Sequence, residues 1–133
     1  MRFAQFFLAG VLSFIMSASA QAETLILETS KGEIKISLLS TLAPNHVSRI
    51  KELVQDGYYD GIIFHRVIPG FMAQTGDPTG TGMSGSGQKL DAEFSDYQYI
   101  NGTVGMARTM DPNSADSQFF ICFQPRFTLD KNY

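Results

Sequence analysis

The sequence predicts a mainly β domain, a small antiparallel barrel or sandwich covered by one helix. Short stretches rich in β-branched and aromatic residues recur along the chain, and glycine-rich turns separate them. One segment instead has the periodicity of an amphipathic helix. A chain of 133 residues suits one domain. Its single cysteine, Cys122, excludes an internal disulfide and a cysteine-based zinc cluster, and we expect it to be buried as a small apolar residue.

Residues 1–22 are predicted to be a signal peptide and not part of the fold. Arg2 precedes the apolar run FFLAGVLSFIM, which is too short to span a bilayer. The segment ends in Ala20-Gln21-Ala22, which fits a small-x-small cleavage pattern. We therefore expect a mature domain of residues 23–133 that is exported to the periplasm and is not attached to a membrane. A membrane anchor and a buried helix are the alternatives for this segment.

The first part of the domain is predicted to form a β-hairpin followed by a helix. Segments 24–29 and 33–38 flank a short turn, and the second segment alternates apolar and polar side chains. In segment 43–57, Pro44 suits the first helical position and Gly57 suits the C-terminal cap. The apolar residues of this helix fall on one face, which we expect to be buried: Val47, Ile50, Leu53 and Val54.

Four further short strands are predicted, at residues 62–67, 71–75, 103–107 and 118–123. Successive side chains of a strand point to opposite faces of its sheet. In the last of these strands we expect Phe119 and Ile121 to face the core, and Phe120 to face the opposite side with polar groups beside it.

The remaining segments give little indication of other chemistry. The loop at residues 76–87 is rich in glycine, but no Gly-Lys-Ser/Thr and no helix pattern follow, which disfavours a phosphate-binding loop. Asp91 and Glu93 are predicted to be solvated loop residues and not a catalytic carboxylate pair. The chain has 13 acidic and 10 basic residues and no basic run, so a nucleic-acid partner is not expected. No metal or cofactor site is predicted.

One arginine, Arg66, stands among apolar residues in the stretch FHRVIPGFMAQTGD. A charged side chain avoids such neighbours unless it is paired or needed for function. A surface ion pair is the structural alternative for Arg66, and core packing is the alternative for Phe71 and Met72. His65 points to the opposite face of the strand, so we expect a buried, hydrogen-bonded histidine and not a general base.

Four segments of the chain together resemble one known family. They are, in order, FHRVIPGFMAQTGD, GTGMSG, NGTVGMA and NSADSQFFI. With these segments the chain resembles the cyclophilins, the cyclosporin-binding peptidyl-prolyl cis-trans isomerases, from Thr24 to Tyr133. It is most similar to the periplasmic bacterial branch. The resemblance implies an antiparallel β-barrel with capping helices, and we expect this chain to be truncated at its C-terminus, without the last strands and the second helix.

The resemblance implies an enzyme that accelerates the isomerisation of X-Pro bonds during protein folding. In the twisted amide of the transition state, the proline nitrogen keeps its lone pair and accepts a hydrogen bond, which it cannot do in the planar ground state. Arg66, a permanent cation with a rigid plane of donors, is expected to donate that bond and to be the catalytic residue. The residues expected to bind the substrate are Phe71, Met72, Gln74, Ala107, Arg108, Gln118, Phe120, Leu129 and Tyr133.

Each part of this set has an expected role. The apolar side chains form the pocket for the proline ring, and Gln74 and Gln118 orient Arg66 and the peptide. The backbone near Ala107 pairs with the residue that precedes proline. The expected partners are proline-containing segments of folding exported proteins, the expected state is a monomer, and no cofactor is implied.

Two alternatives to a prolyl isomerase stay open. The domain could bind proline-containing peptides without turning them over, or it could be an inactive fragment of a longer cyclophilin. An intact Arg66 favours the enzyme over the binding module. Arg108 stands where many members have asparagine, and Tyr133 where many have histidine. Phe127-Thr128 occupies the region that often supplies a tryptophan, so cyclosporin binding is expected to be weak.

Overall fold

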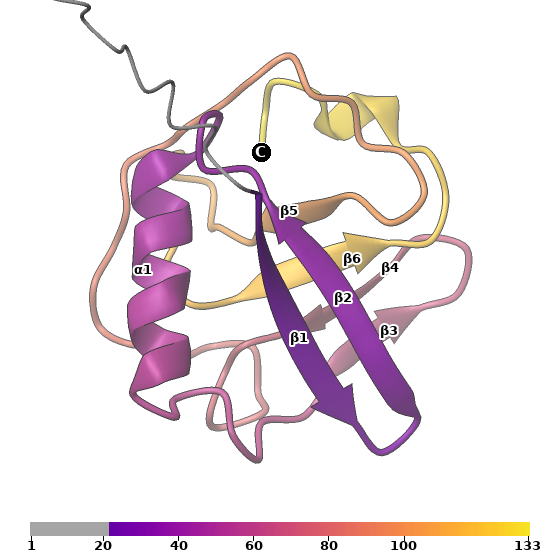
Figure 1. Cartoon of the computed structure of the whole chain (residues 1–133). Coiled ribbons are helices and arrows are strands. Elements are labelled where there is room, and N and C mark those ends of the chain that lie inside the picture. The colour runs from indigo at the N-terminus through magenta and orange to yellow at the C-terminus, as the bar shows by residue number, and fades with distance from the viewer. Residues whose placement is uncertain (1–21) are drawn as a thin grey trace, which may run out of the picture.

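The computed structural model describes residues 22–133, which form one α-helix and two antiparallel β-sheets (Figure 1). Strands β1 (Glu23–Thr29) and β2 (Gly32–Leu38) form the predicted hairpin. The second sheet has the strand order β3-β4-β6-β5. Its strands are β3 (Arg66–Ile68), β4 (Met72–Thr75), β5 (Val104–Met106) and β6 (Phe119–Cys122). The predicted mainly β, antiparallel class with one helix is therefore confirmed.

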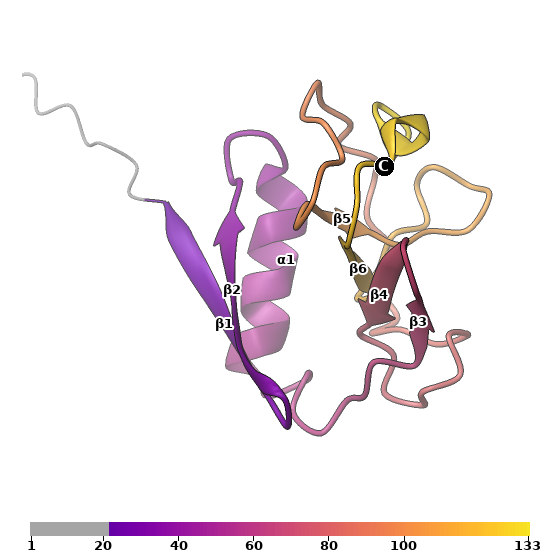
Figure 2. The same cartoon turned by 90° about the vertical axis from the view of Figure 1, so that its right-hand side faces the viewer.

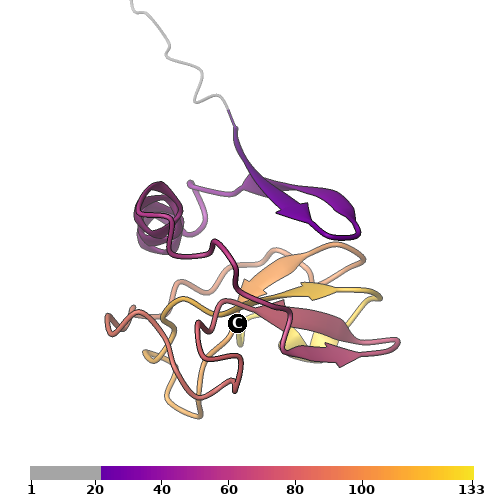
Figure 3. The same ribbon diagram turned by 90° about the horizontal axis from the view of Figure 1, so that it is seen from below.

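The hairpin and the four-stranded sheet lie as two layers, and helix α1 (Pro44–Gln55) runs beside the space between them (Figures 2 and 3). Ile36 of the hairpin, Ile50 of α1 and Phe119 of β6 are buried together in one hydrophobic cluster. Apolar burial of this kind is the main favourable term in folding, so this cluster joins the three elements. Among residues 22–133, no helix is long and apolar enough to cross a membrane. The predicted signal peptide falls almost wholly outside the described residues and stays a prediction.

The strand that contains Arg66 is shorter than predicted. Segment 62–67 was expected to be extended and paired throughout, but the ladder with β4 begins only at Arg66, which pairs with Gln74. Thr75, the last residue of β4, instead donates its hydroxyl to the Ile63 carbonyl at 2.9 Å. This side-chain hydrogen bond stands where the next backbone pair between β3 and β4 would be. A 3₁₀ turn at Phe127–Leu129 was not predicted, because three residues are too few to show a periodic pattern.

Helix α1 begins and ends as predicted. Pro44 occupies the first turn, and Gly57 follows the C-cap with a φ of 72°, a left-handed conformation that glycine adopts without strain. The buried face consists of His46, Val47, Ile50 and Leu53. The expectation that Val54 would be buried is wrong, because Val54 lies in the last turn and is 40% exposed.

The N-terminus of α1 is capped by a residue far away in the sequence. The residue before the helix, Ala43, has no side chain that could accept the free backbone N–H groups. Glu93 accepts them instead, with one carboxylate oxygen 2.9 Å from the Asn45 nitrogen and the other 3.0 Å from the His46 nitrogen. A negative charge there also interacts favourably with the helix dipole. The prediction that Glu93 is merely a solvated loop residue is therefore wrong.

Replacement of Glu93 by alanine is expected to lower the free energy of unfolding by about 1 kcal/mol, because two N–H groups of α1 lose their acceptor. Urea denaturation followed by circular dichroism measures this change. Glu28→Ala is the matched control, because Glu28 is exposed on β1 and makes no ion pair among residues 22–133. Equal urea midpoints for the two variants would show that the cap contributes nothing.

Candidate active site

Strand β6 separates two clusters of apolar side chains. Phe119 and Ile121 belong to the cluster that faces the hairpin and α1, whereas Phe120 and Cys122 belong to a second cluster. Since successive side chains of a strand point to opposite faces, the second cluster lies on the far face of the sheet. The predicted core orientation of Phe119 and Ile121 is therefore confirmed.

The far-face cluster brings together all the apolar residues predicted to bind the proline ring. Met72, Phe120 and Cys122 are buried in it together with Tyr99, and these further residues pack against it: Ile68, Phe71, Ala107, Leu129 and Tyr133. Phe120 lies 5.8 Å from Tyr99 in a stacked arrangement and 5.8 Å from Tyr133 in an edge-to-face arrangement. Burial raises the pKa of the Cys122 thiol, so this thiol stays protonated at neutral pH and is a packing residue, as expected.

Tyr99 belongs to this cluster although no sequence pattern marks it. It follows a loop without periodicity, and its backbone nitrogen is held by the Asp130 carboxylate at 2.8 Å. The one signal that could have indicated it is Gly105, because a Cβ there would lie 2.5 Å from the Tyr99 hydroxyl and 2.7 Å from the Phe120 ring. Because Gly105 of β5 has no side chain, the Tyr99 ring can stack on the Phe120 ring.

The strand register places Arg66 on the same face as this cluster. Arg66 pairs with Gln74, and Gln74 pairs with Phe120, so the three side chains form one row across β3, β4 and β6. Arg66 is exposed, and its Nη1 donates to the Gln74 side-chain oxygen at 3.4 Å. No carboxylate of residues 22–133 lies within ion-pair distance of its guanidinium. The alternative of a surface ion pair for Arg66 therefore has no support in this part of the chain.

Gln74 and Gln118 connect Arg66 to the glycine-rich loop. The Gln74 amide nitrogen donates to the Gln118 side-chain oxygen at 2.8 Å. The Gln118 amide nitrogen donates to the Gly82 carbonyl at 3.0 Å and to the Ser84 carbonyl at 2.8 Å. Because these bonds fix which end of each amide is oxygen, the Gln74 oxygen is directed toward Arg66. This arrangement fits the predicted orienting role of the two glutamines.

Two carboxylates hold the glycine-rich loop in place. Asp77, with no exposed surface, accepts from the Thr79 hydroxyl and from the backbone nitrogens of Thr79 and Ser84. Asp116 accepts from the Ser86 and Gly87 nitrogens at the other end of the loop. Burial alone would raise the pKa of Asp77, but the hydrogen bonds outweigh this and hold the pKa well below its ordinary value. The carbonyl groups that Gln118 contacts are therefore on a fixed loop.

Asp77→Asn is expected to lower the urea midpoint at pH 7, and this difference is expected to shrink as the pH falls below the ordinary carboxyl pKa of 3.8. A carboxyl group whose pKa is lowered by folding contributes stability above its ordinary value of 3.8, and this contribution is lost as the pH falls toward the folded pKa. Urea midpoints of both proteins at several pH values measure the difference. A difference that is as large at about pH 2 as at pH 7 would contradict this assignment.

His65 lies under the glycine-rich loop. Both of its ring nitrogens are buried and have no hydrogen-bond partner in the described part of the chain. A Cβ added at Gly82 would lie 3.3 Å from the His65 Nε2 atom, so the loop backbone passes close to the ring. The expected hydrogen bond of His65 is therefore wrong, because the loop presents glycine there and not a polar side chain.

Ala107 and Arg108 lie at the rim of the cluster. The backbone N–H group of Ala107 and the side-chain N–H groups of Arg108 already donate hydrogen bonds within the chain. The Ala107 nitrogen donates to the Gln118 carbonyl at 2.9 Å. The Arg108 Nε and Nη2 atoms donate to the Asn132 carbonyl at 3.0 and 2.7 Å, and its guanidinium lies 4.4 Å from the centre of the Tyr133 ring. Arg108 therefore holds Tyr133 against the cluster, a positioning role that the prediction of direct substrate binding did not include.

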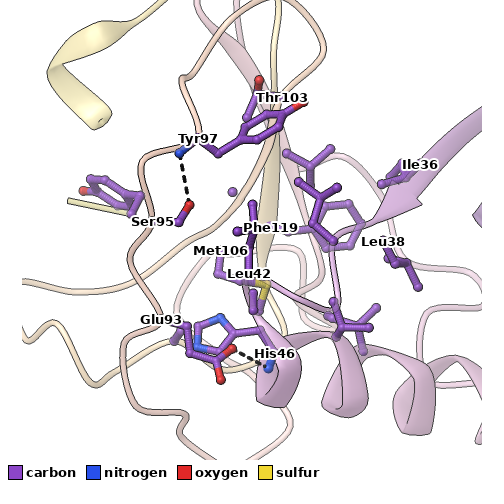
Figure 4. A pocket seen from close by; sticks show the side chains of 18 of the residues that line it. Ile36, Leu38, Leu42, His46, Glu93, Ser95, Tyr97, Thr103, Met106 and Phe119 are labelled. Atoms are coloured by element: carbon purple, nitrogen blue, oxygen red, sulfur yellow. Dashed lines mark hydrogen bonds between the residues drawn. The ribbon is translucent and has the colours of Figure 1, made fainter. Parts of the chain in front are cut away.

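A separate apolar pocket of about 480 Å³ lies on the other face of the sheet, between the hairpin, α1 and the segment from Ala92 to Met106 (Figure 4). Three of the polar side chains that line it, Glu93, His46 and Ser95, are bonded within the chain. Glu93 caps α1, the His46 ring contacts the Asp91 carbonyl at 2.6 Å, and the Ser95 hydroxyl accepts from the Tyr97 nitrogen. Among residues 22–133, no group of three or more His, Cys, Asp or Glu side chains could hold a metal ion.

The profile of the family "Cyclophilin type peptidyl-prolyl cis-trans isomerase/CLD" matches residues 24–133. The chain belongs to the cyclophilin family. A cyclophilin-type isomerase from Cryptosporidium parvum, crystallised in the presence of the dipeptide Ala-Pro, has a TM-score of 0.78 and 34% identity over 82% of this chain and 73% of its own.

Curated cyclophilin relatives are more similar in sequence. A probable peptidyl-prolyl cis-trans isomerase of Brucella suis is 47% identical over 130 residues, which cover 88% of this chain and 66% of the relative. The peptidyl-prolyl cis-trans isomerase of Synechococcus elongatus is 50% identical over 79% of this chain and 72% of its own length. The chain thus spans about 66% of the length of the Brucella relative.

Proposed function

We propose that this cyclophilin-type chain is a peptidyl-prolyl cis-trans isomerase that acts on X-Pro bonds of folding proteins. The observation that carries the proposal is the exposed Arg66 guanidinium, which Gln74 holds on the same face as the apolar cluster around Phe120. A cation that has no ion pair among residues 22–133 and lies beside an apolar cluster fits a substrate that is mostly apolar and becomes a hydrogen-bond acceptor only in the transition state.

The reaction requires no nucleophile, metal or proton transfer. Rotation about the X-Pro bond is slow because the planar amide has partial double-bond character, with a barrier of about 18–20 kcal/mol. Only interactions that are stronger with the twisted amide than with both planar forms accelerate the rotation. An acceleration of about a thousandfold needs about 4 kcal/mol of such preference.

The residues of the far face divide this task between them. The proline ring packs on the half-buried side chains of Phe71, Leu129 and Tyr133, with the buried Met72 and Phe120 behind them. Arg66 then donates to the proline nitrogen once that nitrogen has become pyramidal. Because Gln74 holds the guanidinium before the substrate twists, little reorganisation is needed in the transition state. Gln118 and the fixed glycine-rich loop keep Gln74 in place.

The relatives support this substrate class. The Brucella suis and Synechococcus elongatus proteins carry the name peptidyl-prolyl cis-trans isomerase, and the Cryptosporidium parvum structure was determined in the presence of Ala-Pro. We further propose that the chain is exported to the periplasm and assists exported proteins there. The apolar run after Arg2 and the Ala20-Gln21-Ala22 pattern support export.

A prolyl-isomerisation assay on the purified chain tests the activity. Circular dichroism shows whether the chain is folded, and an Ala-Pro-containing peptide reports the rate of cis-to-trans conversion with and without protein. A folded chain that accelerates the conversion in proportion to its concentration supports the proposal. A folded chain that binds the peptide and leaves its conversion rate unchanged would overturn it, and would identify a module that binds proline-containing segments without catalysis.

A further inference from the structure

The predicted proline site has two different ends along strand β6. At the start of β6, the Ala107 nitrogen donates to the Gln118 carbonyl, and the row of Arg66 and Gln74 lies beside Phe120. At the end of β6, the Phe123 nitrogen donates to the Phe71 carbonyl at 2.9 Å. One end therefore carries the catalytic arginine and the glutamines, and the other end is formed by Phe71.

A second arginine covers the Phe71 end. The guanidinium carbon of Arg126 lies 4.2 Å from the centre of the Phe71 ring. The backbone of Arg126 is fixed, because its nitrogen donates to the Tyr99 carbonyl at 2.8 Å. The side chain is exposed, so one face of the guanidinium stacks on Phe71 while its donor edge stays available.

Arg126 has no carboxylate partner among residues 22–133. The ion pairs of this part of the chain join other residues, on the hairpin, on α1 and between Lys131 and Asp96. The nearest acidic residue in the sequence, Asp130, instead accepts from the Tyr99 nitrogen. The chain as a whole has more acidic than basic residues, whereas the surface at Phe71 carries the positive charge of Arg126.

We propose that Arg126 is a specificity residue that selects an acidic side chain in the segment following proline. The inference rests on the proposed function, in which the residue preceding proline lies at the Ala107 end of the site. A peptide whose proline ring occupies the cluster then leaves past Phe71, alongside the free donor edge of the Arg126 guanidinium. A carboxylate there would accept two parallel N–H bonds from the free edge of the guanidinium.

Paired peptides that differ only in this charge test the proposal. Each pair carries glutamate or its neutral analogue glutamine at the first or at the second position after proline. For each pair we would measure the ratio of kcat/KM values and the ratio of dissociation constants by calorimetry. Wild-type protein is expected to prefer glutamate about fourfold at one of these positions at low salt, and to lose this preference in 0.5 M salt because exposed charges are then screened.

Two variants and one control assign the preference to the guanidinium. Arg126→Met keeps an apolar stem over Phe71 and is expected to reduce the glutamate-to-glutamine ratio to about one, while Arg126→Glu is expected to favour lysine after proline. Lys31→Met removes an exposed cation in the hairpin turn and is expected to leave the ratio unchanged. A wild-type ratio of one at both positions, or the same ratio in Arg126→Met as in wild type, would overturn the proposal.

The isomerisation rates and the dissociation constants are measured separately, so this proposal and the proposed activity can fail independently of each other. If the glutamate preference in binding depends on Arg126 but no peptide is isomerised, the specificity inference stands and the proposed activity fails. If the glutamine peptides are isomerised and the glutamate peptides show no advantage in rate or in binding, the activity stands and the specificity inference fails.

Discussion

Arg66→Ala is expected to lower kcat/KM for X-Pro isomerisation by about 100- to 1000-fold, the range seen when one preorganised transition-state donor is removed. The fold should be unchanged, because Arg66 is exposed and its side-chain hydrogen bond to Gln74 has the long distance of 3.4 Å. Initial rates with an Ala-Pro-containing peptide, together with circular dichroism spectra and urea midpoints, measure both effects.

Two further variants separate charge from geometry at this position. Arg66→Lys keeps the cation but loses the planar set of donors, so it should recover only a small part of the lost rate. Lys31→Ala removes a distant exposed cation and should leave the rate unchanged. If Arg66→Lys were as active as wild type, a general electrostatic effect would account for the rate and a directed donor would not.

The role of Gln74 can be tested in the same series. Gln74 is a positioning residue, since it contacts Arg66 and not the reacting bond in the proposed mechanism. Gln74→Ala should therefore lower kcat/KM in the wild-type background and have almost no further effect when Arg66 is alanine. Additive losses in the double variant would mean that Gln74 acts on the substrate independently of Arg66.

Gly76→Ala is expected to destabilise the fold by about 3 kcal/mol or more, the largest stability effect of any single substitution proposed here. Gly76 has a φ of 100°, and a Cβ there would clash with the Ser117 carbonyl oxygen and lie 2.8 Å from the Gln118 Cα atom. These are backbone atoms in a buried segment, so no side-chain rotation can relieve the clash. Urea denaturation gives the loss in the free energy of unfolding.

Gly87→Ala is the matched control for Gly76→Ala. Gly87 also has a positive φ, 89°, but a Cβ there would meet no atom within 4 Å. Only the left-handed backbone is then penalised, and we expect a loss of about 1–2 kcal/mol. Similar losses for the two variants would mean that the close approach of Gly76 to Ser117 does not contribute to stability.

Local patterns predicted most elements of the fold. The alternation of Ile34, Ile36 and Leu38 predicted a strand with one buried face, and Pro44 and Gly57 predicted the two ends of the helix. These signals depend only on the period of a strand or helix and on backbone preferences at its ends, so they can be read without knowing what the element packs against. The start of β3 was predicted too early, because its length is set by its partner β4.

The candidate site was only partly predictable in the same way. Arg66 could be identified because a permanent charge among apolar residues needs an explanation, and the family resemblance pointed to the surrounding residues. Their common location on one face follows from the register that joins Arg66, Gln74 and Phe120 across three strands. Register between distant strands is a tertiary property, because it depends on which apolar faces are buried together.

Patterns along the sequence were enough to predict short antiparallel strands with one amphipathic helix, and to single out Arg66 as a charge among apolar residues. The folded structure was needed to show that Glu93 caps α1, that Tyr99 completes the apolar cluster and that Arg126 stacks on Phe71. These contacts could not be predicted because each joins residues that are far apart along the chain. Glu93 and Arg126 lie in loops without periodicity, and their contacts exist only after long segments have closed around the two sheets.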